Sequence, residues 1–312
     1  MTLVAGIDTH DLRGDEGAGS SFPSRRGPSF LMAVPALAFF ACFAIVPLLG
    51  VVLLSFMKWD GLGSPEWVGL ANWSRVLTDP VTHHAMKLTV VLTVATWAVQ
   101  CPTSLLLGVF MAGRQRYRAV YSVLYFLPLL FSAAAIGIAF KALLDPNFGL
   151  GTALGIEWLN RDWLGNPSVA LPTLVFVIAW CFIPFHSLLY QGAARQIPRS
   201  MYEAAELDGA SSIGAFRNIT LPQLKNTIVT SSTLMIVGSL TYFDLIFVMT
   251  NGGPGDATRI LPLDMYLRGF RSYDMGGASV VGVILVAVGL CVSYLLNRLG
   301  GSSSMDSQME GM

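Results

Sequence analysis

One polar stretch, set between two long apolar runs, holds the residues with which this chain could grip another molecule. It reads Glu203-Ala204-Ala205, then Gly209 and, further on, Ile219-Thr220-Leu221-Pro222. Glu203 offers a charged hydrogen-bonding group beside two side chains of almost no bulk, so this stretch could form a polar contact with close packing. No Gly-Lys pair occurs in the sequence, and a phosphate-cradling loop needs one. The chain therefore cannot act as its own P-loop ATPase.

Local signals predict a helix, a turn and a second helix in this stretch. Pro198 suits the first turn of a helix because its missing N–H would be unpaired there. A short helix is expected over Arg199–Asp208, and Gly209 stands where that helix must end with a positive φ. Ser211 or Ser212 can cap a second short helix that runs to Leu221-Pro222. An ordinary interfacial connection between two spans would show the same periodicity.

The spacing of these residues resembles the EAA loop of permease subunits of binding-protein-dependent ABC importers. The resemblance implies that the segment from Glu203 to Gly209 inserts into a cleft on a separate ATPase subunit. It assigns ATPase coupling to a set of small, acidic and helix-ending residues: Glu203, Ala204, Ala205, Asp208, Gly209, Leu221 and Pro222. It also implies no catalytic residue, metal ligand or cofactor on this chain, with ATP and Mg²⁺ bound by the partner ATPase subunits.

Two further segments resemble elements of sugar-importer permeases. Thr250-Asn251-Gly252-Gly253-Pro254 is similar to their Thr-x-Gly-Gly-Pro signature, although any tight turn could use the same residues. Gly69-Leu70-Ala71-Asn72-Trp73 is similar to their Gly-Leu-x-Asn-aromatic element. Together the resemblances cover residues 30 to 298 and fit the first permease subunit of a maltose- or glycerol-phosphate-type importer. They imply a cargo that is a sugar, oligosaccharide, polyol or sugar phosphate. The implied partners are a second permease in a heterodimer, two ATPase subunits and an extracytoplasmic solute-binding protein.

The composition of the chain indicates lipid as its solvent. It is 54% hydrophobic and 12% charged, whereas a soluble domain carries roughly 25% charge. Continuous apolar runs favour helices over barrel strands. We therefore predict an all-α polytopic membrane protein with six transmembrane helices. The six runs are Gly27–Met57, Leu88–Gly113, Ala119–Phe140, Leu164–Ala194, Asn226–Phe243 and Met275–Asn297.

The predicted domain organisation is one permease domain between two tails. The domain covers residues 27–298 and includes a cytoplasmic coupling loop at 195–225, while residues 1–26 and 299–312 are expected to be disordered. Three arginines in the second connection, Arg114, Arg116 and Arg118, place that loop inside by the positive-inside rule. Both termini are then cytoplasmic in a multi-pass protein of the plasma or inner membrane. A net charge of zero argues against a nucleic-acid partner.

Candidate residues for the solute pathway carry hydroxyl or aromatic groups. Ser239, Tyr242 and Phe243 follow the i, i+3, i+4 spacing and would share one face of a fifth helix, with Asp244 next to them. Other spans add Phe185, Tyr190 and Ser132. Each could equally be ordinary helix packing. Sugar permeases often carry amides in these spans, but this chain shows mostly apolar residues there, which predicts a weak or absent membrane binding site.

Two other functions fit a chain of this composition. An ion-coupled secondary transporter or channel usually places ionisable groups within its spans, and here the candidates are His186 and Asp244. A single histidine in an apolar helix is more often a hydrogen-bonded structural residue than a proton relay. A purely structural membrane scaffold is the third alternative. Dependence of uptake on an ATPase subunit, rather than on an ion gradient, would separate the importer from both.

Overall fold

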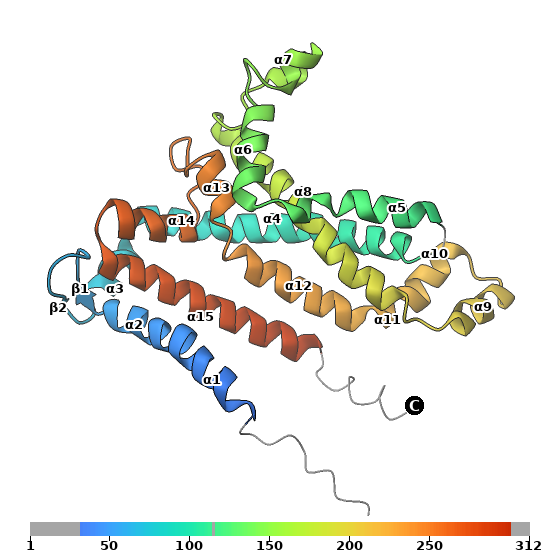
Figure 1. Ribbon diagram of the computed structural model, residues 1–312, viewed down its shortest axis with the longest axis horizontal. Coiled ribbons are helices and arrows are strands. Elements are labelled where there is room, and N and C mark those ends of the chain that lie inside the picture. Colours follow the sequence, from blue (N-terminus) through green and yellow to red (C-terminus); the bar gives the residue numbers. More distant parts are fainter. Residues whose placement is uncertain (1–31, 114–115, 301–312) are drawn as a thin grey trace, which may run out of the picture. The chain divides into compact units, whose positions relative to one another are not determined.

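The computed structural model describes residues 32–113 and 116–300, whose elements are helices and one two-stranded sheet (Figure 1). These residues divide into two compact units, with the boundary between Leu48 and Leu49. The tails predicted at 1–26 and 299–312 lie outside the described residues, except that positions 299 and 300 belong to the last helix, α15 (Met275–Gly300).

The first unit holds α1 (Val34–Phe40), the π-helical turn η2 (Ala41–Ile45) and the first residues of α2 (Val46–Leu54). A proline in the first turn of α1 suits that position because the N–H it lacks would be unpaired. In η2 the N–H of Val46 bonds to the carbonyl of Ala41, immediately before Pro47, which has no N–H for the helical ladder. The resulting helix, Val34–Leu54, has 21 residues and is long and apolar enough to cross a membrane.

In the second unit, the end of α2 is followed by a small hairpin that is fastened by one amide. Strand β1 (Met57–Lys58) pairs antiparallel with β2 (Glu66–Trp67), and helix α3 (Ala71–Thr78) follows. The buried side chain of Asn72 donates Nδ2 hydrogen bonds to the carbonyls of Ser55 at 3.1 Å and Met57 at 2.8 Å. The asparagine of the Gly-Leu-x-Asn-aromatic element therefore ties α3 to the preceding strand.

The core of the second unit lies between the two longest helices and the short helices beside them. Helices α4 (Pro80–Met111) and α8 (Pro167–Ala194) pack along one another. They approach closely at Gly108, where a Cβ atom would lie 2.6 Å from the Cβ of Tyr190. Such contact needs glycine, as is common where apolar helices cross. A buried apolar cluster continues this interface toward the start of the helices, through Leu92, Leu174, Ile178, Ile246 and Leu263.

The third predicted span is interrupted. It consists of α5 (Arg116–Tyr125), the 3₁₀ turn η3 (Leu127–Leu130) and α6 (Ala133–Leu143). Pro128 lies in the first turn of η3, and Ser132 caps α6 by accepting a hydrogen bond from the N–H of Ala135 at 3.2 Å. A proline and a capping serine so close together end one helix and begin another. Apolar composition did not reveal this break.

The fifth predicted span is also interrupted. Helix α12 (Lys225–Ser239) has 15 residues, and α13 (Asp244–Met249) begins after a non-helical connection. The prediction that Ser239, Tyr242 and Phe243 share one helical face is therefore wrong, since Ser239 is the last residue of α12 and the other two precede α13. The Gly-Gly-Pro segment that follows α13 is a tight turn, as expected, with positive φ at Asn251 and Gly252.

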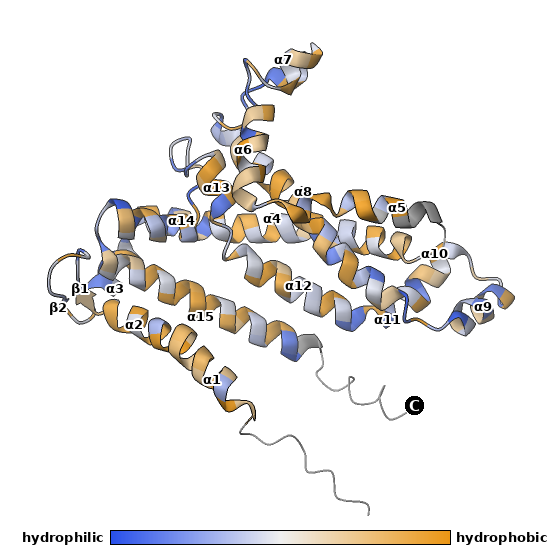
Figure 2. Cartoon of the chain, in the orientation of Figure 1, coloured by the Kyte–Doolittle hydropathy of each residue, from blue (hydrophilic) through white to orange (hydrophobic). Residues whose placement is uncertain are grey.

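Four helices among the described residues are long and apolar enough to span a membrane, so the structure does not establish six spans: Val34–Leu54, Pro80–Met111, Pro167–Ala194 and Met275–Arg298. Short elements complete the chain: α7 (Leu150–Leu154), the 3₁₀ turn η4 (Glu157–Asn160), α9 (Arg199–Leu207), α10 (Ser212–Ala215), the π turn η5 (Phe216–Thr220), α11 (Leu221–Gln223), α14 (Leu261–Tyr266) and the π turn η6 (Leu267–Arg271). Figure 2 shows apolar residues along α15 and hydrophilic residues concentrated on α9.

Candidate functional site

The predicted helix–turn–helix is present, and its local signals act as expected. Helix α9 begins after Pro198, and Gly209 has φ of +76° just beyond its end. The N–H of Ala210 bonds to the carbonyl of Ala205 at 2.8 Å, a helix-ending arrangement that a left-handed glycine permits. Ser211 caps α10 by accepting from the N–H of Gly214 at 3.2 Å. We call the segment from Arg199 to Ala215 the α9–α10 knob.

The predicted coupling residues lie together on this knob and at its return to α12. Glu203, Ala204, Asp208 and Gly209 are exposed, and Ala205 is half-buried. The remaining two, Leu221 and Pro222, open the short helix α11.

Two large apolar side chains on the knob are also open to solvent. Leu207 is 90% exposed and Ile213 is 79% exposed. Large apolar side chains that are open to solvent on a polar element are available to a protein partner that covers it. Leu207 was not predicted to belong to the coupling set, although its place directly before the helix-ending Asp208-Gly209 pair would have indicated it.

One polar contact ties the knob to the segment before α12, and another joins the ends of the two long helices next to it. The hydroxyl of Tyr202 lies 2.9 Å from that of Thr220, so α9 is tied directly to the segment that leads into α12. The side chain of Gln191 donates from Nε2 to the carbonyl of Met111 at 3.0 Å and so joins the ends of α8 and α4. A cavity of about 820 Å³ separates these helix ends from the knob, and Arg195, Arg199 and Tyr202 are among its lining residues.

A second cavity, of about 470 Å³, lies among α8, the connection after α12, and the start of α6. Its wall is aromatic, and the ring of Phe182 stacks on Tyr242 with centroids 5.2 Å apart. Polar groups on the same wall come from His186, Thr241, Tyr242 and Asp244. Aromatic faces together with a few hydrogen-bonding groups can hold a polar solute that also has C–H surfaces.

Four of the seven residues predicted for the pathway line this cavity: Phe185, Tyr242, Phe243 and Asp244. The other three lie elsewhere. Ser239 is fully buried and shares a hydrogen bond of 2.7 Å with Thr93. The hydroxyl of Tyr190 is buried 3.7 Å from the sulfur of Cys101, and Ser132 caps α6.

His186 lines the cavity although it was not predicted to belong to the pathway. Its Nδ1 lies 3.0 Å from the hydroxyl of Ser231, as expected for a structural histidine. Phe182 and Thr241 were also missed. Phe182 lies on α8 three residues before the predicted Phe185, and that helical spacing could have indicated it.

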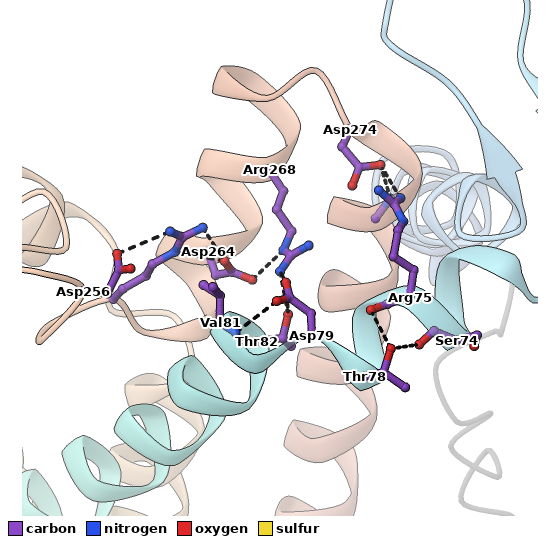
Figure 3. Close-up of polar contacts among 12 residues, drawn as sticks. Ser74, Arg75, Thr78, Asp79, Val81, Thr82, Asp256, Asp264, Arg268 and Asp274 are labelled. Atoms are coloured by element: carbon purple, nitrogen blue, oxygen red, sulfur yellow. Dashed lines mark hydrogen bonds and ion pairs between the residues drawn. The ribbon is translucent and has the colours of Figure 1, made fainter.

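A chain of ion pairs joins the start of α4 to α14 and η6 (Figure 3). Arg268 contacts Asp79 and donates to Asp264 at 2.8 Å, and Arg259 donates to the same Asp264 at 2.8 Å. Asp264 is completely buried, so its charge is compensated by two guanidinium groups rather than by water. The i, i+4 spacing of Asp264 and Arg268 is a sequence signal for part of this network, and it was overlooked.

The network shifts the ionisation of its members. Burial alone would raise the pKa of Asp79, but hydrogen bonds from Arg268 and from the N–H of Val81 outweigh it and hold that pKa below its usual value. Burial alone would lower the pKa of Arg268, whereas its bonds to Asp264 and Asp79 raise it. Asp79 also caps α4, accepting from the N–H of Val81 at 3.0 Å.

Comparison with solved structures defines the class to which this fold belongs. The chain resembles a subunit of a bacterial alginate ABC transporter solved in complex with an alginate pentasaccharide-bound periplasmic protein. The TM-score is 0.76 at 20% sequence identity, over 86% of this chain and 92% of that one. The fold is that of an ABC importer permease.

Sequence comparison shows the family. Residues 104–301 match the model of the binding-protein-dependent transport system inner membrane component, and the chain belongs to that family. It is 31% identical to the probable ABC transporter permease protein YurN of Bacillus subtilis (strain 168), over 85% of this chain and 93% of YurN. It is 28% identical to the arabinooligosaccharides transport system permease protein AraP of the same organism, over 90% and 91% of the two chains. The chain is thus a multi-pass permease subunit of an ABC importer, with sugar-transport relatives, and not an enzyme.

Proposed function

We propose that this chain forms one half of the pore of an ATP-driven importer for a sugar, an oligosaccharide or a related polyol or sugar phosphate. The observation that carries the proposal is the α9–α10 knob, a polar element with exposed Leu207 and Ile213 on a chain that has no phosphate-binding loop of its own. ATP hydrolysis then takes place on separate subunits, and the knob is the place where they act.

The proposed assembly contains a second permease, two ATPase subunits and an extracytoplasmic binding protein. The knob lies on the cytoplasmic side with both termini, and ATP with Mg²⁺ binds to the ATPase subunits. Three kinds of observation support this arrangement: the sugar-transport names among the relatives, the periplasmic protein that accompanies the alginate transporter in its crystal structure, and the sequence of the coupling loop.

Closure of the two ATPase subunits would be transmitted as a rigid-body displacement of the knob. The Tyr202–Thr220 hydroxyl contact, at 2.9 Å, carries that displacement toward α12. Solute would pass by the 470 Å³ cavity, where Phe185, Tyr242, Phe243 and Asp244 face the space. A secondary transporter has less support, because His186 is hydrogen-bonded to Ser231 at 3.0 Å.

The test changes one exposed leucine on the knob and compares it with an equally exposed leucine in another loop. Leu207 and Leu62 are both 90% exposed. In membranes that hold the complete transporter, Leu207→Asp is expected to release the ATPase subunits on detergent extraction and to abolish ATP-dependent uptake. Leu62→Asp is expected to retain the ATPase subunits. Normal ATPase retention and uptake in Leu207→Asp, or uptake driven by an ion gradient without ATP, would contradict the proposal.

A further inference from the structure

One buried side chain in α4 has no hydrogen-bonding partner for either end of its amide. Gln100 is 0% exposed, and neither its Nε2 nor its Oε1 makes a hydrogen bond within the described part of the chain. The one other buried side-chain atom without a partner among the described residues is the hydroxyl of Ser187. Because buried polar groups in folded proteins are nearly always paired, an unpaired amide requires an explanation.

The surroundings of Gln100 connect it to the 470 Å³ cavity. Its amide interacts with the hydroxyl of Tyr242 without reaching hydrogen-bond geometry. Tyr242 lines the cavity and stacks on Phe182, which lines it too, whereas Gln100 does not. Tyr242 thus contacts the open space on one side and the amide on the other.

The chemistry of an amide suits one class of solute. Gln100 can donate two hydrogen bonds from Nε2 and accept two at Oε1. Neighbouring hydroxyls of a sugar or polyol each donate and accept, so a pair of them can satisfy both ends of one amide. The aromatic faces of Tyr242 and Phe182 can cover the C–H surface of the same solute. The amide of Gln100 would then lack hydrogen-bonding partners only while no solute is bound.

We propose that Gln100 is a solute-recognising residue that hydrogen-bonds to neighbouring hydroxyls of the transported polyol or sugar once Tyr242 turns aside. The proposal rests on the function proposed above. The amide belongs to the apolar run Leu88–Gly113, outside the spans from which the candidate pathway residues were chosen, and it lies among the buried residues of α4.

The test measures how many solute molecules are imported for each ATP hydrolysed by the complete reconstituted transporter with loaded binding protein. This ratio separates recognition in the membrane from binding-protein affinity. Gln100→Met keeps the size of the side chain and removes both hydrogen-bonding ends. It is expected to lower the ratio about tenfold, the effect of losing roughly one net hydrogen bond. The effect should shrink for a deoxy analogue that lacks one of the hydroxyls.

Ser187→Ala is the matched control, because it removes the other unpaired buried group, which, unlike Gln100, has no recorded interaction with Tyr242. It is expected to keep the wild-type ratio. If Gln100→Met does not assemble, Gln100→Asn keeps the amide but withdraws it by one methylene, and an intermediate ratio is expected. A wild-type ratio in Gln100→Met or Gln100→Asn, or an equal fall in Ser187→Ala, overturns the proposal and leaves the proposed importer standing. Failure of the wild-type complex to import any carbohydrate or polyol would instead refute the importer function, and this inference with it.

Discussion

Arg268 and Asp79, which are 189 residues apart in the chain, form an ion pair between η6 and the residue that caps α4. Arg268 also bonds to the hydroxyl of Thr82 at 2.6 Å and to the buried carboxylate of Asp264. One guanidinium group therefore holds the start of a long membrane helix against the segment that precedes the last one. We therefore expect its removal to destabilise the second unit.

We expect Arg268→Met to destabilise the protein by about 3 kcal/mol, because it leaves charged partners in a buried place. This loss of stability is at the lower end of the range for breaking a buried ion pair, because Asp264 keeps its ion pair with Arg259. Arg271→Met is the control, as Arg271 is an exposed neighbour for which the described structure shows no ion pair. Its effect should stay within about 0.5 kcal/mol. Thermal unfolding of the detergent-solubilised proteins measures both, and equal midpoints would contradict the prediction.

Asp79 predicts a dependence of stability on acidity. Its pKa is lower in the folded protein than in the unfolded chain, so the carboxylate stabilises the fold fully above the ordinary aspartate pKa of about 4. That contribution is lost as the pH falls through the lowered pKa. Asp79→Asn should therefore be less stable than wild type at neutral pH, and the difference should narrow below about pH 4. Unfolding midpoints taken from pH 7 down to pH 3 test this, and a gap that stays constant would count against it.

Gly108 predicts a steric limit on the contact between α4 and α8. A side chain there would meet the Cβ of Tyr190 at 2.6 Å and the carbonyl oxygen of Ser187 at 2.7 Å. Gly108→Val should cost about 1–3 kcal/mol or more, because a backbone carbonyl cannot turn away. Gly192→Ala, on α8 itself, meets nothing within 4 Å and should be neutral or slightly stabilising. A Gly108→Val protein as stable as the Gly192→Ala protein would show that the helices can separate.

Changes in the α9–α10 knob should separate ATP hydrolysis from solute uptake. Glu203→Lys reverses the charge of the polar contact, and Gly209→Pro forces φ near −65° where the chain needs +76°. The double variant should insert into membranes yet hydrolyse ATP without importing solute. Uptake and ATP hydrolysis are measured together in reconstituted vesicles. Wild-type transport by the double variant would refute the docking role of the knob.

Local signals in the sequence were sufficient to predict the knob. Pro198, Gly209 and Ser211 each act within three or four residues, so their effect on helix ends does not depend on distant parts of the chain. The same holds for the turn at Gly252 and Gly253.

The prediction of spans failed for the third and fifth runs, because it did not address whether each helix is continuous. Apolar composition reports which solvent a segment occupies, but it does not report whether its helix is continuous. The runs around Pro128 and Ser239 are predominantly apolar and are broken all the same. The grouping of Ser239 with Tyr242 depended on an unbroken helix and failed with it.

Long-range contacts explain most of what sequence reasoning missed at the sites. The pairing of Asp79 with Arg268 and the interaction of Gln100 with Tyr242 join residues more than a hundred positions apart. A single sequence gives no signal for such pairs. Gln100 was also overlooked because one polar residue hardly changes the average character of a long apolar run.

The connection between Ser239 and Asp244 has a mechanical consequence. Helix α12 packs mainly on α4 and α15, whereas α13 packs mainly on α6, and both also contact α8. The helical hydrogen bonds of α12 already end at Ser239. Helices α12 and α13 can therefore shift relative to each other without breaking a backbone hydrogen bond within either helix. The cavity beside Tyr242 lies at this seam, so its volume can change at little cost in secondary structure.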